Sequence, residues 1–264
     1  MKILKVKDFN LDITLSCGQV FRWYKHHDGF WYGFISNKIV KLGQIGDLLY
    51  YQGAAGKSDI FKYFNLNEDY KKILRSIAKD ALIKKAIRKY LGLRIIKQDP
   101  FECLMTYIFS SQNNIPRINK MANELSRRSG KKIKFESREY FAFPRLIDLK
   151  GCCRQDIRAC KLGFRDKFLE DAINKLWNKE VSLNKIAKLP YKKAKEEILK
   201  IKGVGNKVAD CVLLFGFNKY EAFPVDRWIL RAMEKHYKGK DGSYFGKYAG
   251  YAQEFLYLYI RDAR

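Results

Sequence analysis

The spacing of apolar residues changes near residue 57, and this change limits the folds open to the chain. Before it, two segments rich in aromatic and β-branched side chains favour strands, and Asp28-Gly29 between them is a hairpin signal. Two shorter runs of the same kind follow, separated by glycines. We therefore predict a small antiparallel sheet. The predicted strands are residues 19–25, 30–36, 38–42 and 47–52.

Beyond residue 57 the apolar residues follow a helical period, as Ile73, Ile77 and Ile87 illustrate. Asp99 and Pro100 then fit the N-cap and first position of a new helix. Most of the remaining chain reads as short helices joined by brief connectors. The fold class predicted is α+β. We expect an N-terminal antiparallel β domain with flanking helices over residues 1–98 and a mainly α-helical body over residues 99–264.

The charge of the chain indicates a polyanionic partner. Its 264 residues include 53 Lys and Arg against 28 Asp and Glu, a formal net charge of +25. A folded protein this basic is suited to nucleic acid, although a generally lysine-rich proteome would give a similar balance. The N-terminus carries charge at short intervals, which does not fit a signal peptide. We expect a cytoplasmic protein, associated with the nucleoid in a prokaryote.

Six cysteines lie at irregular spacing and contain no C-x-x-C pair. A zinc site or a redox pair is therefore not expected, and reduced thiols are the simplest interpretation. The cysteines are Cys17, Cys103, Cys152, Cys153, Cys160 and Cys211.

Two glycines, Gly203 and Gly205, lie between two helical patterns at residues 193–200 and 208–214. Glycines at this spacing allow a tight hairpin that presents the N-terminus of the second helix, and such an N-terminus can bind a phosphate. The alternative is an ordinary turn between two core helices with solvated lysines around it.

Asp226 lies nineteen residues after Lys207, where a further helical stretch begins. An Asp in this place commonly caps the helix. It can equally hold a carboxylate near an electrophilic carbon, and both roles can apply to the same residue.

These motifs resemble those of the helix-hairpin-helix DNA glycosylases, and most of all the 8-oxoguanine DNA glycosylases. The hairpin KGVGNKVADC at residues 202–211 and FPVD at 223–226 carry the likeness. Further blocks follow the family's order: SCGQVFRW at 16–23, QDPFEC at 98–103, SSQNNIPRI at 110–118 and YAGYAQ at 248–253. The resemblance implies a helix-hairpin-helix motif at about residues 193–216.

The resemblance also implies a chemistry and its residues. The family's catalytic lysine falls on Lys207, which would attack the sugar carbon, form a Schiff base and permit strand cleavage by β-elimination. The family's carboxylate falls on Asp226, which would stabilise positive charge at that carbon. The flipped base would lie against Cys211, Gln253 and Tyr257. By the same resemblance, the Gly18 carbonyl would accept the N7 hydrogen that 8-oxoguanine has and guanine lacks.

Contacts to DNA are implied for a further set of residues. Lys202 replaces a usual proline, and Trp228 stands where eukaryotic relatives have a histidine, which makes Arg227 a candidate for the lost contact. The implied DNA-binding residues are Gln112, Asn113, Arg117, Phe164, Arg165, Lys202, Gly203, Gly205 and Arg227.

The expected partner is double-stranded DNA containing 8-oxoguanine, bound by a monomer. We expect no metal site and no iron–sulfur cluster, since no cysteines follow Cys211. A monovalent cation held by backbone carbonyls at the hairpin is compatible with the sequence. Two other functions stay open at this point: an alkylated-base glycosylase of the same superfamily, and a non-catalytic DNA-binding helix-hairpin-helix protein.

Overall fold

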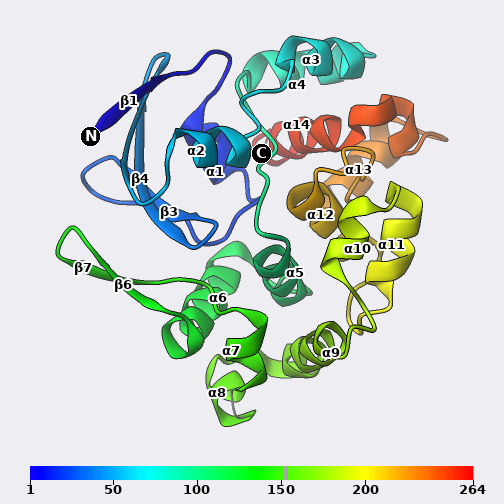
Figure 1. Ribbon diagram of the computed structural model, residues 1–264. Helices are drawn as coiled ribbons and strands as arrows, with labels where there is room; N and C mark the ends of the chain where they lie inside the picture. The colour runs from blue at the N-terminus through cyan, green and yellow to red at the C-terminus, as the bar shows by residue number, and fades with distance from the viewer. Residues whose placement is uncertain (152–153, 264) are drawn as a thin grey trace.

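The computed structural model describes residues 1–151 and 154–263, and it confirms the α+β class (Figure 1). A five-stranded antiparallel sheet forms the N-terminal part, and most of the helices gather into a body beside it. The strands are β1 (Lys2–Lys5), β2 (Tyr24–Lys25), β3 (Trp31–Ile35), β4 (Lys38–Ile45), β5 (Leu48–Gly53), β6 (Lys132–Phe135) and β7 (Arg138–Phe141).

The helices vary in length from five to fifteen residues. They are α1 (Leu11–Ser16), α2 (Lys57–Tyr63), α3 (Tyr70–Ile77), α4 (Ala81–Lys89), α5 (Pro100–Phe109), α6 (Ile115–Ser129), α7 (Leu146–Lys150), α8 (Arg154–Ala159), α9 (Asp166–Trp177), α10 (Leu183–Lys188), α11 (Tyr191–Leu199), α12 (Asn206–Phe217), α13 (Arg227–His236) and α14 (Ala249–Arg261). Two 3-10 helices, η1 (Gly163–Arg165) and η2 (Gly242–Tyr248), complete the set.

The sheet has the strand order β1-β5-β4-β3-β2, with neighbouring strands antiparallel. Its buried face carries Val40, Leu42 and Leu49, each fully buried. Helix α2 covers this face with Ile60, and Phe64 follows at its end. The strand predictions for residues 30–36, 38–42 and 47–52 are confirmed, with β4 reaching three residues further.

The strand predicted over residues 19–25 is wrong except for its last two residues, which form β2. Residues 17–23 leave the sheet because Gln19 uses its amide to bind the backbone elsewhere. Its Nε2 donates to the Thr14 and Arg94 carbonyls at 3.0 and 2.8 Å, and its Oε1 accepts from the Ile96 N–H at 2.8 Å. Strand β1 and the separate hairpin β6–β7 were not predicted, since both are short and flanked by charge.

The helical body is organised around α12, in which every residue from Val208 to Gly216 is buried. Helix α12 packs against α5 and α11, and α14 lies across α4 and α13. The apolar core of the body also includes Ile73 and Ile83, from α3 and α4. The domain boundary at residue 98 stays a prediction.

Several helices begin at side chains that cap them, as the sequence indicated. Asp99 accepts from the Phe101 and Glu102 N–H groups, with Pro100 at the first helical position. Helices α11, α12 and α13 follow the predicted stretches to within a few residues. The helix-hairpin-helix motif is therefore confirmed in place.

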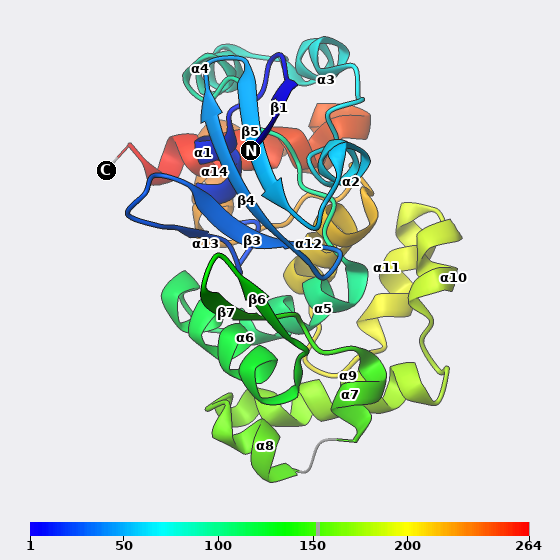
Figure 2. The same ribbon diagram turned by 60° about the vertical axis from the view of Figure 1, so that its left-hand side comes forward.

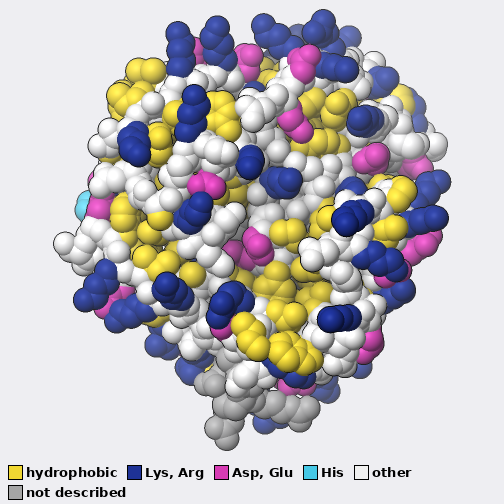
Figure 3. Space-filling model, viewed as in Figure 1, with side chains coloured by type: hydrophobic (Ala, Val, Ile, Leu, Met, Phe, Trp, Pro, Cys, Tyr) yellow, Lys and Arg dark blue, Asp and Glu magenta, His cyan; other side chains and the backbone are white. Residues whose placement is uncertain are grey.

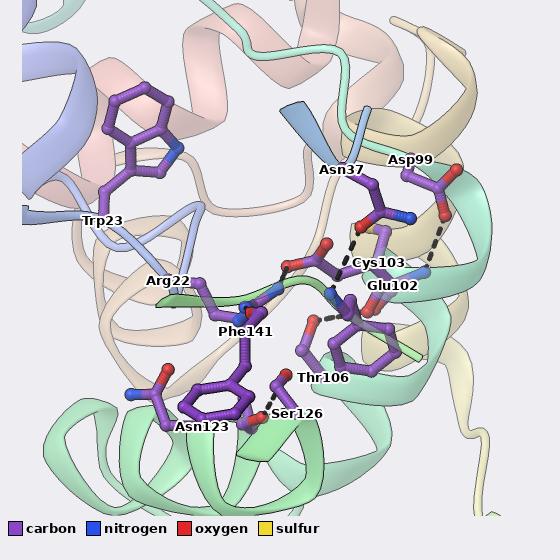
Figure 4. Close-up of polar contacts among 12 residues, drawn as sticks. Arg22, Trp23, Asn37, Asp99, Glu102, Cys103, Thr106, Asn123, Ser126 and Phe141 are labelled. Atoms are coloured by element: carbon purple, nitrogen blue, oxygen red, sulfur yellow. Dashed lines mark hydrogen bonds and ion pairs between the residues drawn. The ribbon is translucent and has the colours of Figure 1, made fainter. Parts of the chain in front are cut away.

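A buried ion pair joins the N-terminal segment to the helical body (Figure 4). The Arg22 guanidinium bonds to Glu102 at 3.2 Å and also donates to the Phe141 carbonyl at the end of β7. The Arg22 side chain is 5% exposed and the Glu102 side chain 19%. Three elements distant in sequence therefore meet on one arginine.

The β6–β7 hairpin lies beneath the main sheet (Figure 2), and a second polar cluster joins the two. The Tyr32 hydroxyl bonds to Asp28 and to Glu136 at 2.7 and 2.8 Å. Lys41 lies 3.1 Å from each of the same two carboxylates. The hairpin that interrupts the helical body is thereby attached to the sheet.

Lysine and arginine side chains are spread over the whole face seen in Figure 3, with isolated acidic side chains between them. Within residues 1–151 and 154–263, none of the helices is long and apolar enough to cross a membrane. Cys17, Cys103, Cys160 and Cys211 are unbridged and buried. Cys152 and Cys153 lie outside the described residues.

We predict that Arg22→Met destabilises the protein by about 3 kcal/mol, because it leaves the Glu102 carboxylate buried without its partner. Urea unfolding measures the change. Lys38→Met is the matched control, since its pair with Asp59 is largely exposed and contributes no more than about 1 kcal/mol. Equal losses in the two variants would contradict the role assigned to Arg22.

Candidate active site

A cleft of about 1430 Å³ opens where the N-terminal segment meets the helical body. Thirteen of the fifteen residues predicted from sequence to act on the base or the DNA line it. Arg165 and Lys202 are the two that do not. The residues from the prediction that line the cleft are Gly18, Gln112, Asn113, Arg117, Phe164, Gly203, Gly205, Lys207, Cys211, Asp226, Arg227, Gln253 and Tyr257.

The hairpin before α12 forms one wall of the cleft. Gly203 has φ +82°, and a Cβ there would lie 2.2 Å from the ring of Phe168 on α9. Gly205 has an extended backbone with open space around it. The two glycines therefore differ: Gly203 is required by packing, whereas Gly205 leaves the N-terminus of α12 open to an approaching group.

The first turn of α12 carries Lys207, which is half-buried in the cleft wall. Its Nζ lies 5.4 Å from the centre of the Tyr107 ring. Cys211 follows one turn later and is 4% exposed. Burial raises the pKa of the Cys211 thiol to about 12, although the nearby Lys207 charge acts to lower it. The thiol is thus neutral at physiological pH and is not activated as a nucleophile.

Asp226 lies at the N-terminus of α13 and lines the cleft. Its Oδ1 accepts from the Trp228 and Ile229 N–H groups, both at 2.9 Å. The predicted cap is confirmed. These bonds use one carboxylate oxygen and fix the direction of the side chain, so the cap also orients the carboxylate.

Gly18 reaches the cleft through the turn that follows α1. Its φ of +103° is in the region that favours glycine, and a Cβ would lie 3.1 Å from Ile115 Cδ1. The neighbouring Gln19 is 1% exposed, and its carbonyl accepts from Gln98 Nε2 and from the Tyr107 hydroxyl. The backbone at Gly18 is therefore held rigidly beside the cleft.

Helix α14 supplies the opposite wall with Gln253 and Tyr257. Gln253 is 4% exposed, and its Oε1 is buried without a hydrogen-bond partner. Buried acceptors are rarely left unpaired, so this oxygen is suited to a donor on a ligand. The Tyr257 hydroxyl lies 3.8 Å from the Cβ position of Gly18, which brings this wall next to the N-terminal segment.

Tyr107 and Glu254 are two of the cleft residues that were not predicted from the sequence. Tyr107 lies beneath Lys207, and Glu254 follows Gln253 with 5% exposure. Burial, with Asp226 in the same direction, raises the pKa of Glu254 to about 8. The sequence did carry a signal for Glu254, because it is the one acidic residue in α14, an otherwise largely apolar helix.

The loop between α5 and α6 forms the outer rim, with Gln112 at φ +48° and Arg117 exposed. Phe164 belongs to η1, is 49% exposed and lines the cleft. Arg165 is 3% exposed and donates to the Ser111 and Gln112 carbonyls, so it holds this rim from behind. A direct DNA contact by Arg165 stays a prediction.

Lys202 and Arg227 are both exposed beside the cleft. The Lys202 N–H donates to Asp171 on α9 at 2.7 Å, which anchors the hairpin, and Lys202 is not among the residues that line the cleft. Arg227 lines the cleft at the start of α13. A phosphate contact by either residue stays a prediction.

Comparison with known proteins agrees with this geometry. Residues 2–104 match the family described as 8-oxoguanine DNA glycosylase, N-terminal domain. The structure superposes with a TM-score of 0.92 on the 8-oxoguanine glycosylase/lyase of Clostridium acetobutylicum, which was solved with double-stranded DNA containing cytosine opposite 8-oxoguanine. The identity is 35%, covering 100% of this chain and 98% of that one. The chain belongs to the 8-oxoguanine DNA glycosylase/lyase family.

Other members of this family are more distant. A probable N-glycosylase/DNA lyase of Methanothermobacter thermautotrophicus is 30% identical over 200 residues, a stretch that spans 64% of this chain and 64% of that protein. The N-glycosylase/DNA lyase OGG1 of Arabidopsis thaliana is 26% identical over 95% of this chain and 77% of its own length. The family assignment made from the sequence motifs is therefore confirmed.

Across residues 1–151 and 154–263 there is no group of three or more His, Cys, Asp or Glu side chains placed to hold a metal ion. The expectation that the protein needs no cofactor stays a prediction, as does the monovalent cation at the hairpin.

We predict that Gly203→Ala and Gly205→Ala separate packing from DNA binding. The first should cost about 2–4 kcal/mol, because a methyl group meets the Phe168 ring in a left-handed backbone. The second should change stability little and weaken DNA binding, because its methyl group faces the opening. Thermal unfolding and fluorescence anisotropy with a DNA duplex measure both; a stable Gly203→Ala protein would contradict the packing role.

We also predict a pH-dependent gain in stability for Glu254→Gln. The folded pKa of about 8 lies above the ordinary 4.5 of a glutamate, so ionising Glu254 opposes folding. This penalty grows as the pH rises from about 4.5 to about 8. Relative to wild type, the Tm of the variant should therefore rise by at least about 2–4 °C between pH 5 and pH 8. Glu196→Gln on the exposed face of α11 is the control. If the difference in Tm from the wild type did not change with pH in either variant, Glu254 would have an ordinary pKa.

Proposed function

We propose that this protein excises 8-oxoguanine from double-stranded DNA and then cleaves the strand, with Lys207 as the nucleophile. The observation that carries the proposal is the arrangement of one cleft: an amine on α12, a carboxylate on α13 and an unpaired acceptor on α14 all face it. The cleft exceeds the roughly 300–1,000 Å³ of a small-molecule pocket, which leaves room for a nucleotide and its flanking backbone.

Reaching the base requires that it leave the duplex. Phe164 and the loop carrying Gln112 and Asn113 lie at the rim, where they would occupy the space that the base vacates. Arg117 would contact the unpaired opposite base. The hairpin glycines, with Lys202 and Arg227 nearby, would bind the backbone phosphates through the N-terminus of α12 and through charge.

Within the cleft, recognition would depend on hydrogen-bond direction. 8-Oxoguanine carries a hydrogen at N7, whereas guanine carries a lone pair there. A carbonyl at Gly18 would accept the first and repel the second. Gln253 Oε1 would accept hydrogens from the pairing edge, and Cys211 and Tyr257 would contact the two faces of the ring.

The chemistry would then begin with the neutral amine of Lys207. Its nitrogen bonds to C1′ of the sugar as the bond from C1′ to the base breaks, and the base leaves with the electron pair and takes up a proton. Asp226 stabilises the positive charge that develops on the sugar, without forming a bond to it. Opening of the sugar gives a Schiff base on Lys207, and loss of the C2′ proton then expels the 3′ phosphate.

We further propose that the protein acts as a monomer in the cytoplasm and needs no metal or cluster. A lysine and a carboxylate suffice for the steps above. The alkylated-base alternative predicts excision by water and no covalent intermediate. The non-catalytic alternative predicts no base release at all.

We predict that sodium borohydride traps wild-type protein on a duplex containing 8-oxoguanine opposite cytosine. Lys207→Gln should abolish trapping, while Lys202→Gln, which alters an exposed lysine of the same hairpin, should retain it. Asp226→Asn should keep the helix cap and slow base release by at least about 100-fold. Gel separation of trapped, nicked and intact strands measures all three.

Three results would count against this function. They are undiminished trapping in Lys207→Gln, full activity in Asp226→Asn, and release of alkylated purines in preference to 8-oxoguanine. A substrate series with 8-oxoguanine opposite each of the four bases, scored separately for base release and nicking, defines the opposite-base preference.

A further inference from the structure

Two neighbouring residues of α14 present buried polar atoms with no partner. These atoms are Gln253 Oε1 and Glu254 Oε2. Both residues line the cleft, and neither side chain is more than 5% exposed. Buried polar atoms without partners are rare in native proteins. The presence of two of them in the same cavity indicates that they bond to a ligand. The mechanism above uses Gln253 and leaves Glu254 without a task.

Glu254 is surrounded by charged and titratable groups from several elements. The thiol of Cys17, which follows α1, lies within hydrogen-bonding reach of its carboxyl. Lys207 and Arg261 favour the ionised form, whereas Asp226 and burial favour the neutral form, and burial is the largest effect. The other titratable groups that interact with it are Tyr107, Cys211 and Tyr257. At neutral pH the carboxyl therefore keeps its proton and is a hydrogen-bond donor.

We propose that Glu254 is a further base-recognition residue, whose neutral carboxyl donates a hydrogen bond to the 6-oxygen of the flipped 8-oxoguanine. This inference rests on the proposed function. Along the edge of that base, the 6-oxygen lies between N1–H and N7–H. Glu254 occupies the corresponding place in the cleft: it follows Gln253, proposed for N1–H, and it lies against Cys17, which precedes Gly18, proposed for N7–H.

The hydrogen-bonding groups at these three positions then match, in order, the groups along the edge of the base. Two acceptors, at Gln253 and Gly18, face the two N–H groups, and one donor, at Glu254, faces the oxygen between them. The cost of burying Glu254 Oε2 without a partner would be recovered when the base enters. A base with hydrogen in place of the 6-oxygen would leave Glu254 unpaired.

Binding measurements on a catalytically inactive background test this role, since the lesion then stays intact. In Lys207→Gln protein, Kd is measured for duplexes that carry 8-oxoguanine, guanine or 8-oxo-2-aminopurine, which lacks the 6-oxygen and, with it, the hydrogen at N1. Each Glu254 variant is therefore compared with its parent on the same duplex, so that the altered N1 contact affects both proteins alike. Glu254→Leu should weaken binding to 8-oxoguanine about tenfold and leave binding to 8-oxo-2-aminopurine within about twofold. Glu254→Gln, whose amide N–H is still a donor, should bind 8-oxoguanine as the parent does.

The pH profile gives a second readout that a merely structural residue would not change. Affinity of the parent for the 8-oxoguanine duplex, relative to the guanine duplex, should fall as the pH rises through about 8. The Glu254→Gln variant should show no such fall, because its amide does not titrate. Glu196→Gln serves as the control for a change of charge elsewhere, and thermal unfolding verifies that each variant is folded.

Several outcomes would overturn the inference. One is an equal loss for both lesions in Glu254→Leu, and another is a Glu254→Gln protein as weak as Glu254→Leu. A relative affinity that rises through pH 8 would mean that an ionised acceptor is needed. If the parent protein did not prefer 8-oxoguanine over guanine, the proposed function itself would be contradicted. This result is therefore distinguishable from the others, which concern Glu254 alone.

Discussion

The buried amide of Gln19 is the constraint on which the rest of the site depends. Its side chain bonds to the backbone at Thr14, Arg94 and Ile96, while its carbonyl accepts from Gln98 and Tyr107. These bonds hold the segment out of the sheet and join it to Tyr107 of α5. The next residue back, Gly18, is thereby presented to a cleft whose other walls are built by residues from Tyr107 to Tyr257. Together with the ion pair between Arg22 and Glu102, this link fixes the N-terminal segment against the helical body.

Several side chains serve the fold and the site at once. Asp226 begins α13 by accepting two backbone N–H groups, and the same bonds aim its carboxylate into the cleft. Gly203 permits the hairpin to pack on Phe168, and this packing sets where the N-terminus of α12 opens. Arg165 is buried behind the rim loop and fixes the carbonyls of Ser111 and Gln112. The geometry of the site is therefore determined largely by residues that also stabilise the structure.

The cleft also holds groups that oppose stability. Gln253 Oε1 and Glu254 Oε2 are buried without partners, and each costs free energy that a hydrogen bond would offset. A carboxyl at this depth keeps its proton near neutral pH, which limits but does not remove the cost. Such groups are retained where a ligand supplies the missing partner, and the net charge of +25 on the chain favours a ligand that is an anion.

The sequence by itself determined the order of the elements, the helix-hairpin-helix motif and the family. Those depend on local signals: the spacing of apolar residues, the capping positions of Asp99 and Asp226, and the glycines at 203 and 205. Tertiary structure decided what local signals do not encode. The strand expected at residues 19–23 was lost because the bonds of Gln19 are to residues far along the chain. Glu254 and Tyr107 line the cleft, whereas Arg165 lies behind its rim. Neither result could be predicted from local sequence, because burial and contacts between distant segments determine the protonation, direction and partners of a side chain.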